Sequence, residues 1–86
     1  MEKIKQLRNA FDGLFSREIF ESSYIEILDR EDLILAANEE GYLYLIDKII
    51  SLCETQSEFE HYHFDEAGMV DKCEKNLLMK YKNSTW

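Results

Sequence analysis

The sequence predicts an α+β fold, in which a mainly antiparallel four-stranded sheet packs against one long helix and a second helix lies at the N-terminus. The first observation is a pair of aromatic and aliphatic runs, 22–28 and 33–37, separated by a polar stretch of hairpin-loop length. The second is a stripe of apolar residues at helical spacing from 39 to 54. The third is a pair of segments, 60–65 and 77–82, in which apolar and polar residues alternate as in half-buried strands.

The chain length predicts a single domain. A chain of 86 residues forms one modest core, because a domain of this size buries only about 60 to 65% of the surface of its unfolded chain. Its 45% apolar and 33% charged residues place it among soluble globular proteins. We expect one domain over 1–86, with an N-terminal helix in 1–15 and the hairpin, long helix and two further strands in 22–82. A helical turn is expected around 69–73.

The N-terminal segment has one apolar stripe. Ile4, Leu7, Phe11 and Leu14 are three or four positions apart, with polar residues between them, as on one face of a helix. We expect this stripe to dock on the domain's own sheet. Pairing of the stripe with a second copy is the alternative, so the chain is expected to be a monomer or a homodimer.

The long helix has a clear start. Asn38 is a suitable N-cap, and Glu39 and Glu40 complement the positive end of the helix dipole. The apolar residues that follow are expected to face the sheet: Tyr42, Leu45, Ile46, Ile49, Ile50 and Cys53.

The strand after the long helix separates aromatic from polar side chains. Strand side chains alternate between two faces, so Tyr62 and Phe64 are expected to enter the core. His61, His63 and Asp65 then point the other way.

The middle of the chain carries most of its negative charge. The net charge is −8, and residues 26–74 contain fourteen acidic and three basic residues, which gives −11. Such a field repels phosphate backbones and speeds encounter with a basic protein. We therefore expect a protein partner and no nucleic acid, although an acidic surface also serves solubility.

The sequence lacks the motifs that are typical of several functional classes. The sequence has no nucleophile elbow, phosphate loop or paired-cysteine metal site, so we expect a binder without cofactor and not an enzyme. Cys53 and Cys73 are expected to be reduced, with Cys53 a small core residue. The longest apolar run is far below the roughly 20 residues of a membrane span, and the N-terminus differs from a signal peptide, so a cytoplasmic protein without membrane contact is expected.

Four segments together suggest a family. They are the run from Leu35 to Leu45 with its Asn-Glu-Glu-Gly helix start, the helix through Leu52, the His-Tyr-His-Phe-Asp strand at 61–65 and the strand at 77–81. Over 33–82 this pattern resembles small bacterial immunity proteins of polymorphic-toxin systems, of the kind called immunity family thirty-two. The resemblance implies a compact α+β domain that binds and neutralises a cognate toxin.

An inhibitor of this kind is expected to use acidic loops and the polar face of the strand at 61–65. Tyr44 lies off the apolar helix stripe and is predicted to be an exposed contact, whereas Tyr42 and Tyr62 are assigned to the core. The candidate partner-binding residues are Asp29, Glu31, Asp32, Tyr44, Glu58, Glu60, His61, His63, Asp65 and Glu66.

A metal site is the competing interpretation of the polar strand face. His61, His63 and Asp65 offer imidazole and carboxylate ligands that suit zinc or iron(II). A further ligand would have to come from elsewhere, with Glu26 or Glu58 as possible donors. A third interpretation is a structural or homo-oligomeric module that associates through the N-terminal helix.

Overall fold

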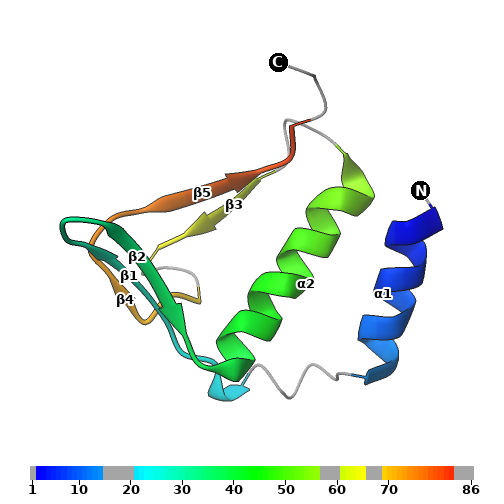
Figure 1. Ribbon diagram of the computed structural model, residues 1–86, viewed down its shortest axis with the longest axis horizontal. Helices are drawn as coiled ribbons and strands as arrows, with labels where there is room; N and C mark the ends of the chain where they lie inside the picture. Colours follow the sequence, from blue (N-terminus) through cyan, green and yellow to red (C-terminus); the bar gives the residue numbers. More distant parts are fainter. Residues whose placement is uncertain (1, 15–20, 57–60, 66–68, 83–86) are drawn as a thin grey trace.

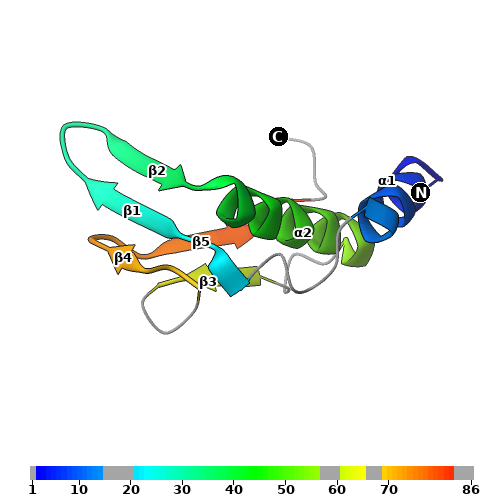
Figure 2. The ribbon, with the colours of Figure 1, turned by 90° about the horizontal axis from the view of Figure 1, so that it is seen from below.

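The computed structural model, drawn in Figure 1, describes residues 2–14, 21–56, 61–65 and 69–82. Its elements follow one another in the order α1 (Glu2–Leu14), β1 (Ile25–Asp29), β2 (Leu33–Ala37), α2 (Glu39–Thr55), β3 (His61–Phe64), β4 (Lys72–Cys73) and β5 (Leu77–Lys80). The molecule is flat, with extents of 38 × 36 × 21 Å. Helix α2 lies between the strands on one side and α1 on the other (Figures 1 and 2).

The broad α+β class is confirmed, but the single four-stranded sheet is wrong. The strands form a three-stranded sheet in the order β2-β1-β4 and a separate β3-β5 pair. The β1–β2 and β3–β5 pairs are antiparallel, whereas β1 and β4 are parallel. Strand β4 occupies the edge of β1 where another predicted strand would have joined, so β3 and β5 pair only with each other.

The segment expected to hold a helical turn is instead strand β4. Backbone hydrogen bonds hold it against β1, because the amide of Asp71 donates to the carbonyl of Ile25 and that of Glu74 to Ile27, each at 2.8 Å. The Asp71 carboxylate also accepts from the amide of Ile25 at 2.9 Å. These contacts join residues more than forty positions apart, which local sequence patterns do not reveal.

The core lies between the strands and one face of α2. Its buried residues are Ile25, Ile27, Leu45, Phe64 and Val70. The prediction that the aromatic residues of β3 point inward is confirmed, since Phe64 is buried and Tyr62 packs against this cluster.

Asn38 caps α2 as the sequence predicts, and it also ties the start of this helix to the hairpin. The Asn38 side-chain oxygen accepts from the amide of Gly41 at 2.8 Å, which caps the helix, and from that of Tyr24 at 2.9 Å. Its side-chain nitrogen donates to the carbonyl of Ser22 at 2.8 Å. One side chain therefore positions α2 on the chain that enters β1.

The expected docking of the N-terminal helix on the sheet is wrong, because α1 packs against α2. Phe11 is its buried residue. Arg8 donates to Asp47 at 2.6 Å and to Ser51 at 2.9 Å, and it also pairs with Glu54 at 3.1 Å. Leu7 and Leu14 remain exposed, so only part of the predicted stripe is covered.

Helix α2 is therefore covered on two opposite faces. Gly41, Leu45 and Leu52 are buried towards the strands, and Ile50, close to Asp47 on the helix surface, is buried on the side of α1. The flank between these faces carries apolar residues that the sequence assigned to the core, namely Tyr42, Ile46, Ile49 and Cys53. Tyr42, Ile46 and Ile49 are exposed and Cys53 is half-buried.

Candidate binding surface

The β1–β2 turn gathers the first group of predicted contact residues. Asp29, Glu31 and Asp32 are all exposed there. The guanidinium of Arg30 pairs with the carboxylate of Glu74, which also accepts from the amide of Asp29 at 2.8 Å. Because Glu74 offsets the one basic residue of the turn, the three remaining carboxylates leave it acidic.

The pairing of Arg30 predicts a pH effect on stability. The hydrogen bond from Arg30 and that from the Asp29 amide lower the pKa of Glu74 below its usual value of 4.5. A carboxylate with a lowered folded-state pKa stabilises the fold above its unfolded pKa, and this contribution is lost as the pH falls through the folded value. Glu74→Gln should therefore be less stable than the original chain at pH 7, with the difference shrinking below about pH 4.5. Denaturant unfolding across this range measures it, and a difference that does not depend on pH would contradict the assignment.

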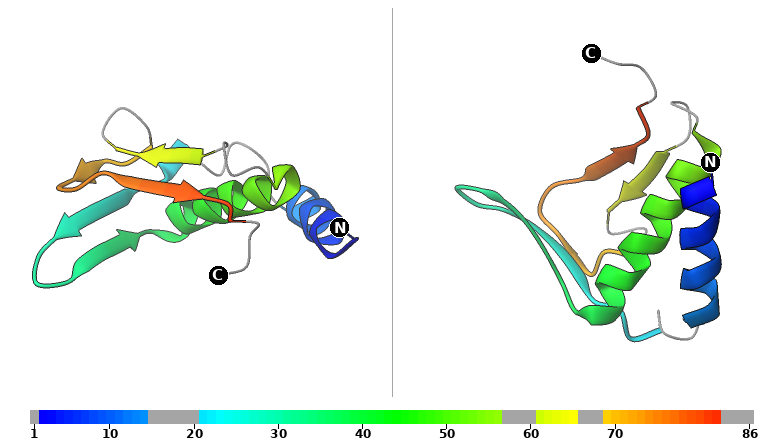
Figure 3. Two further views of the ribbon diagram at one scale, coloured as in Figure 1. Left: turned by 90° about the horizontal axis from the view of Figure 1, so that it is seen from above. Right: turned by 45° about the vertical axis from the view of Figure 1, so that its right-hand side comes forward.

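The second group lies on β3, apart from the hairpin turn. Figure 3 shows the turn projecting away from α2, whereas β3 begins near the C-terminal end of that helix. His61 and His63 are exposed on the outer face of β3, with ring centroids 4.7 Å apart in an edge-to-face arrangement. Their partners across the strand pair are Lys80 and Leu78. The predicted contact residues therefore divide into two separate patches.

Several predicted positions cannot be placed on either patch. Glu58, Glu60 and Glu66 lie outside the described residues. Asp65 follows β3 and is half-buried. Within the described ranges, no three His, Cys, Asp or Glu side chains are close enough together to hold a metal ion, so nothing in them adds support to the metal interpretation of the strand.

Tyr44 and Tyr42 each lie in the environment that the sequence predicted for the other. Tyr44 is half-buried and packs against the core cluster, with the Lys48 ammonium 5.1 Å from its ring centroid. Burial raises the pKa of its hydroxyl. Tyr42 is instead 45% exposed on the flank of α2. The more accessible aromatic contact is thus Tyr42.

The sequence reasoning missed an exposed apolar region on β2 and α2. It extends from β2 onto the adjoining flank of α2, where the Tyr42 hydroxyl donates to the Leu35 carbonyl at 3.5 Å. We call it the β2 edge surface, and its side chains, between 40% and 56% exposed, are Leu33, Leu35, Tyr42, Ile46 and Ile49. The run Leu-Ile-Leu-Ala-Ala in β2 was the available signal, since a strand with one solvent-facing side normally alternates with polar residues.

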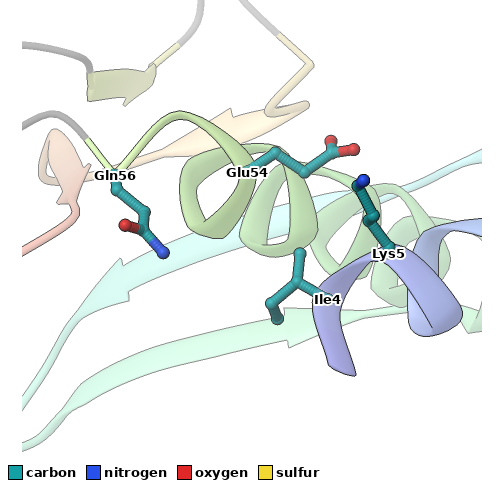
Figure 4. Close-up of a pocket in the computed structure, with 4 residues that line it drawn as sticks. All are labelled: Ile4, Lys5, Glu54 and Gln56. Atoms are coloured by element: carbon teal, nitrogen blue, oxygen red, sulfur yellow. The ribbon is translucent and has the colours of Figure 1, made fainter. Parts of the chain in front are cut away.

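A pocket of about 420 Å³ lies between the two helices and is lined by Ile4, Lys5, Glu54 and Gln56. Figure 4 shows that the first two come from α1 and the others from the end of α2. Glu54 already pairs with Arg8. The described part of the lining holds no histidine and no hydroxyl or thiol group, and its charged side chains are Lys5 and Glu54.

Comparison of the chain with protein-family models, curated proteins and solved structures gave no significant match. The resemblance to immunity family thirty-two therefore stays a prediction. In the described parts of the chain, neither helix is long and apolar enough to cross a membrane.

Proposed function

We propose that this chain is a bacterial immunity protein that binds a cognate toxin stoichiometrically and blocks it. The observation that carries the proposal is the exposed apolar β2 edge surface, which is bordered by the acidic hairpin turn at one end and by the acidic first turn of α2 at the other. Apolar patches with polar rims are typical of protein-binding sites. The acidic border favours a basic partner and speeds encounter with it.

The proposed role depends on the rate of association with the toxin more than on a catalytic step. An inhibitor that protects its own cell must bind before the toxin acts, and opposite charges raise association rates above the ~10⁵ to 10⁶ M⁻¹s⁻¹ of uncharged docking. The net charge of −11 over residues 26–74 supplies such a field. A toxin that acts on nucleic acid would offer the matching basic surface, because its substrate is a phosphate chain.

Co-expression tests the proposal. The toxin domain encoded beside this chain should stop growth of a host when expressed alone, and growth should recover when the chain is expressed with it. The two proteins should then co-purify as a complex. Failure to protect against, or bind to, any neighbouring secreted protein would contradict the immunity role.

Self-association is the second candidate function. Leu7 and Leu14 of α1 are 49% and 75% exposed, so this helix still has apolar surface that a second copy would cover. Light scattering at micromolar concentration should then give the mass of two chains. The mass of one chain would contradict this candidate.

A further inference from the structure

Strand β2 forms one edge of the three-stranded sheet, because the strand order is β2-β1-β4. Natural edge strands are commonly protected by lysine, proline or a bulge against pairing with other chains. Strand β2 reads Leu-Ile-Leu-Ala-Ala and pairs with β1 without a bulge from Leu33 to Ala37. Its exposed edge therefore lacks these protections.

The hydrogen bonds around β1 reveal which backbone groups of β2 face this edge. In an antiparallel pair, residues that bond across the strands alternate with residues that do not. The amide of Asn38 bonds to the carbonyl of Tyr24 at 3.0 Å, so the opposed pair 38 and 24 is a bonded one. Leu35 and Ile27, three positions further along each strand, then form a non-bonded pair.

The hydrogen bonds on the β4 side of β1 independently support the same assignment of the β2 backbone groups. The carbonyls of Ile25 and Ile27 accept from residues 71 and 74 on the β4 side, so these two residues do not use them for β2. Their partners in register are Ala37 and Leu35. The backbone N–H and C=O groups of Leu33, Leu35 and Ala37 therefore point away from β1, towards the open edge of the sheet.

These outward groups have few partners in the described structure. The Leu35 carbonyl accepts the long bond from Tyr42. Within the described ranges, the amides of Leu33, Leu35 and Ala37 donate no hydrogen bond to any other element. They form a row spaced for an added strand, and Tyr42, Ile46 and Ile49 supply apolar surface beside it.

The charges beside this row favour one kind of occupant. Acidic residues stand before β2 at Glu31 and Asp32 and after it at Glu39 and Glu40, and no basic residue occurs between Arg30 and Lys48. A second copy pairing antiparallel about Leu35 would bring the acidic turn before β2 of each copy near the acidic first turn of α2 of the other. Like charges opposed in this way are destabilising, so a segment with basic ends fits better than β2 of another copy.

We propose that an extended segment of the partner protein adds to β2 as a further antiparallel strand. Its alternate apolar side chains would pack on the β2 edge surface, and its Lys or Arg residues at both ends would face the acidic residues that flank β2. Main-chain bonds supply affinity in such strand addition, and side-chain pockets supply specificity. The inference rests on the proposed function only in identifying the toxin as the source of the segment.

A peptide tests the surface without a toxin. The probe is the synthetic peptide Lys-Lys-Val-Thr-Val-Thr-Val-Lys-Lys, titrated into the isotope-labelled chain and followed by NMR. Amide signals of residues 33–37, Tyr42 and Ile46 should shift with saturation. A matched peptide with glutamate in place of every lysine should bind at least about tenfold more weakly, because it opposes the acidic border. Absent shifts in β2, or equal binding of both peptides, would overturn the proposal.

Variants test the same surface in the complex with a protective partner. Leu35→Lys and Ile46→Lys should each lower affinity about tenfold or more, since both introduce a charge at the centre of the contact. Leu7→Lys is the matched control, because it places the same charge at a residue of similar exposure on α1, where no predicted contact residue lies. It should change affinity less than about twofold, and thermal unfolding should show that all three variants fold.

The outcomes separate the two proposals. If the partner binds but Leu35→Lys and Leu7→Lys weaken binding equally, strand addition at β2 is overturned while the immunity role stands. If the peptide saturates β2 but no neighbouring protein is bound or inhibited, the immunity role falls and the surface stands. If the chain forms a dimer and Leu35→Lys makes it monomeric, β2 pairs with a second copy and the proposal is overturned.

Discussion

Replacing Gly41 with alanine is expected to destabilise the fold by about 3 kcal/mol, as overpacking of a tight contact does. A Cβ at this position would lie 2.5 Å from the Tyr24 carbonyl oxygen and 2.9 Å from the Ala37 Cβ. The Tyr24 oxygen belongs to the backbone and also accepts from the Asn38 amide, so it cannot move without breaking the junction of β1 and α2. The helix-propensity gain of about 1 kcal/mol from alanine is too small to compensate.

Gly13 provides the matched control in α1. Among the described residues, no atom beyond the chain neighbours and the helix's own backbone lies within 4 Å of a Cβ built there, so Gly13→Ala should stabilise the chain by about 0.5 to 1 kcal/mol through helix propensity alone. Urea unfolding measures both variants. A Gly41→Ala chain as stable as Gly13→Ala would show that α2 does not approach the hairpin as closely as described.

Replacing Arg8 with methionine is expected to cost about 2 to 3 kcal/mol and to loosen α1 from α2. Burial by itself lowers the pKa of Arg8, but hydrogen bonds to Asp47, Glu54 and Asp12 outweigh it and raise the pKa above the ordinary value. Asp47 is also largely buried, so removal of the guanidinium leaves its carboxylate without its main partner.

Two further variants define the effect of Arg8. Arg8→Lys should fall between the original chain and methionine, because lysine keeps the charge but not the planar fork that reaches several acceptors. Lys3→Met removes a charge from an exposed position of the same helix and should change stability by less than about 0.5 kcal/mol. Amide hydrogen exchange should accelerate in α1 with Arg8→Met alone. Equal exchange in Arg8→Met and Lys3→Met would contradict the role given to Arg8.

The elements that the sequence predicted well are those whose signals are local. The hairpin follows from two apolar runs around a polar turn, and the start of α2 follows from the capping chemistry of Asn38. The inward direction of Tyr62 and Phe64 follows from strand alternation. Each depends on neighbours within a few positions.

The elements that it missed depend on distant contacts. Strand β4 is only Lys72–Cys73, too short to show a period, and it is held by bonds from Asp71 and Glu74 to β1. That strand then separates β3 and β5 from the other sheet. No pattern within 69–80 distinguishes this arrangement from one continuous sheet.

The candidate surface was missed for a related reason. Helix α2 has apolar residues around much of its circumference, and only the positions of the strands and α1 determine which of them are covered. Arg8 draws α1 onto the side of Asp47, which leaves Tyr42 and Ile46 open while Tyr44 packs on the core. Acidic residues were easier to select from sequence than an exposed apolar flank, because charge is expected at the surface wherever it occurs.

A titration of inhibition tests most directly whether this chain acts by occupying another protein. Increasing amounts of the purified chain are added to a fixed amount of the toxin domain encoded beside it, and the remaining toxin activity is measured. Activity should fall in proportion to the chain added and vanish near one chain per toxin. Inactivation of many toxin molecules by one chain, or full activity in the presence of excess chain, would contradict it.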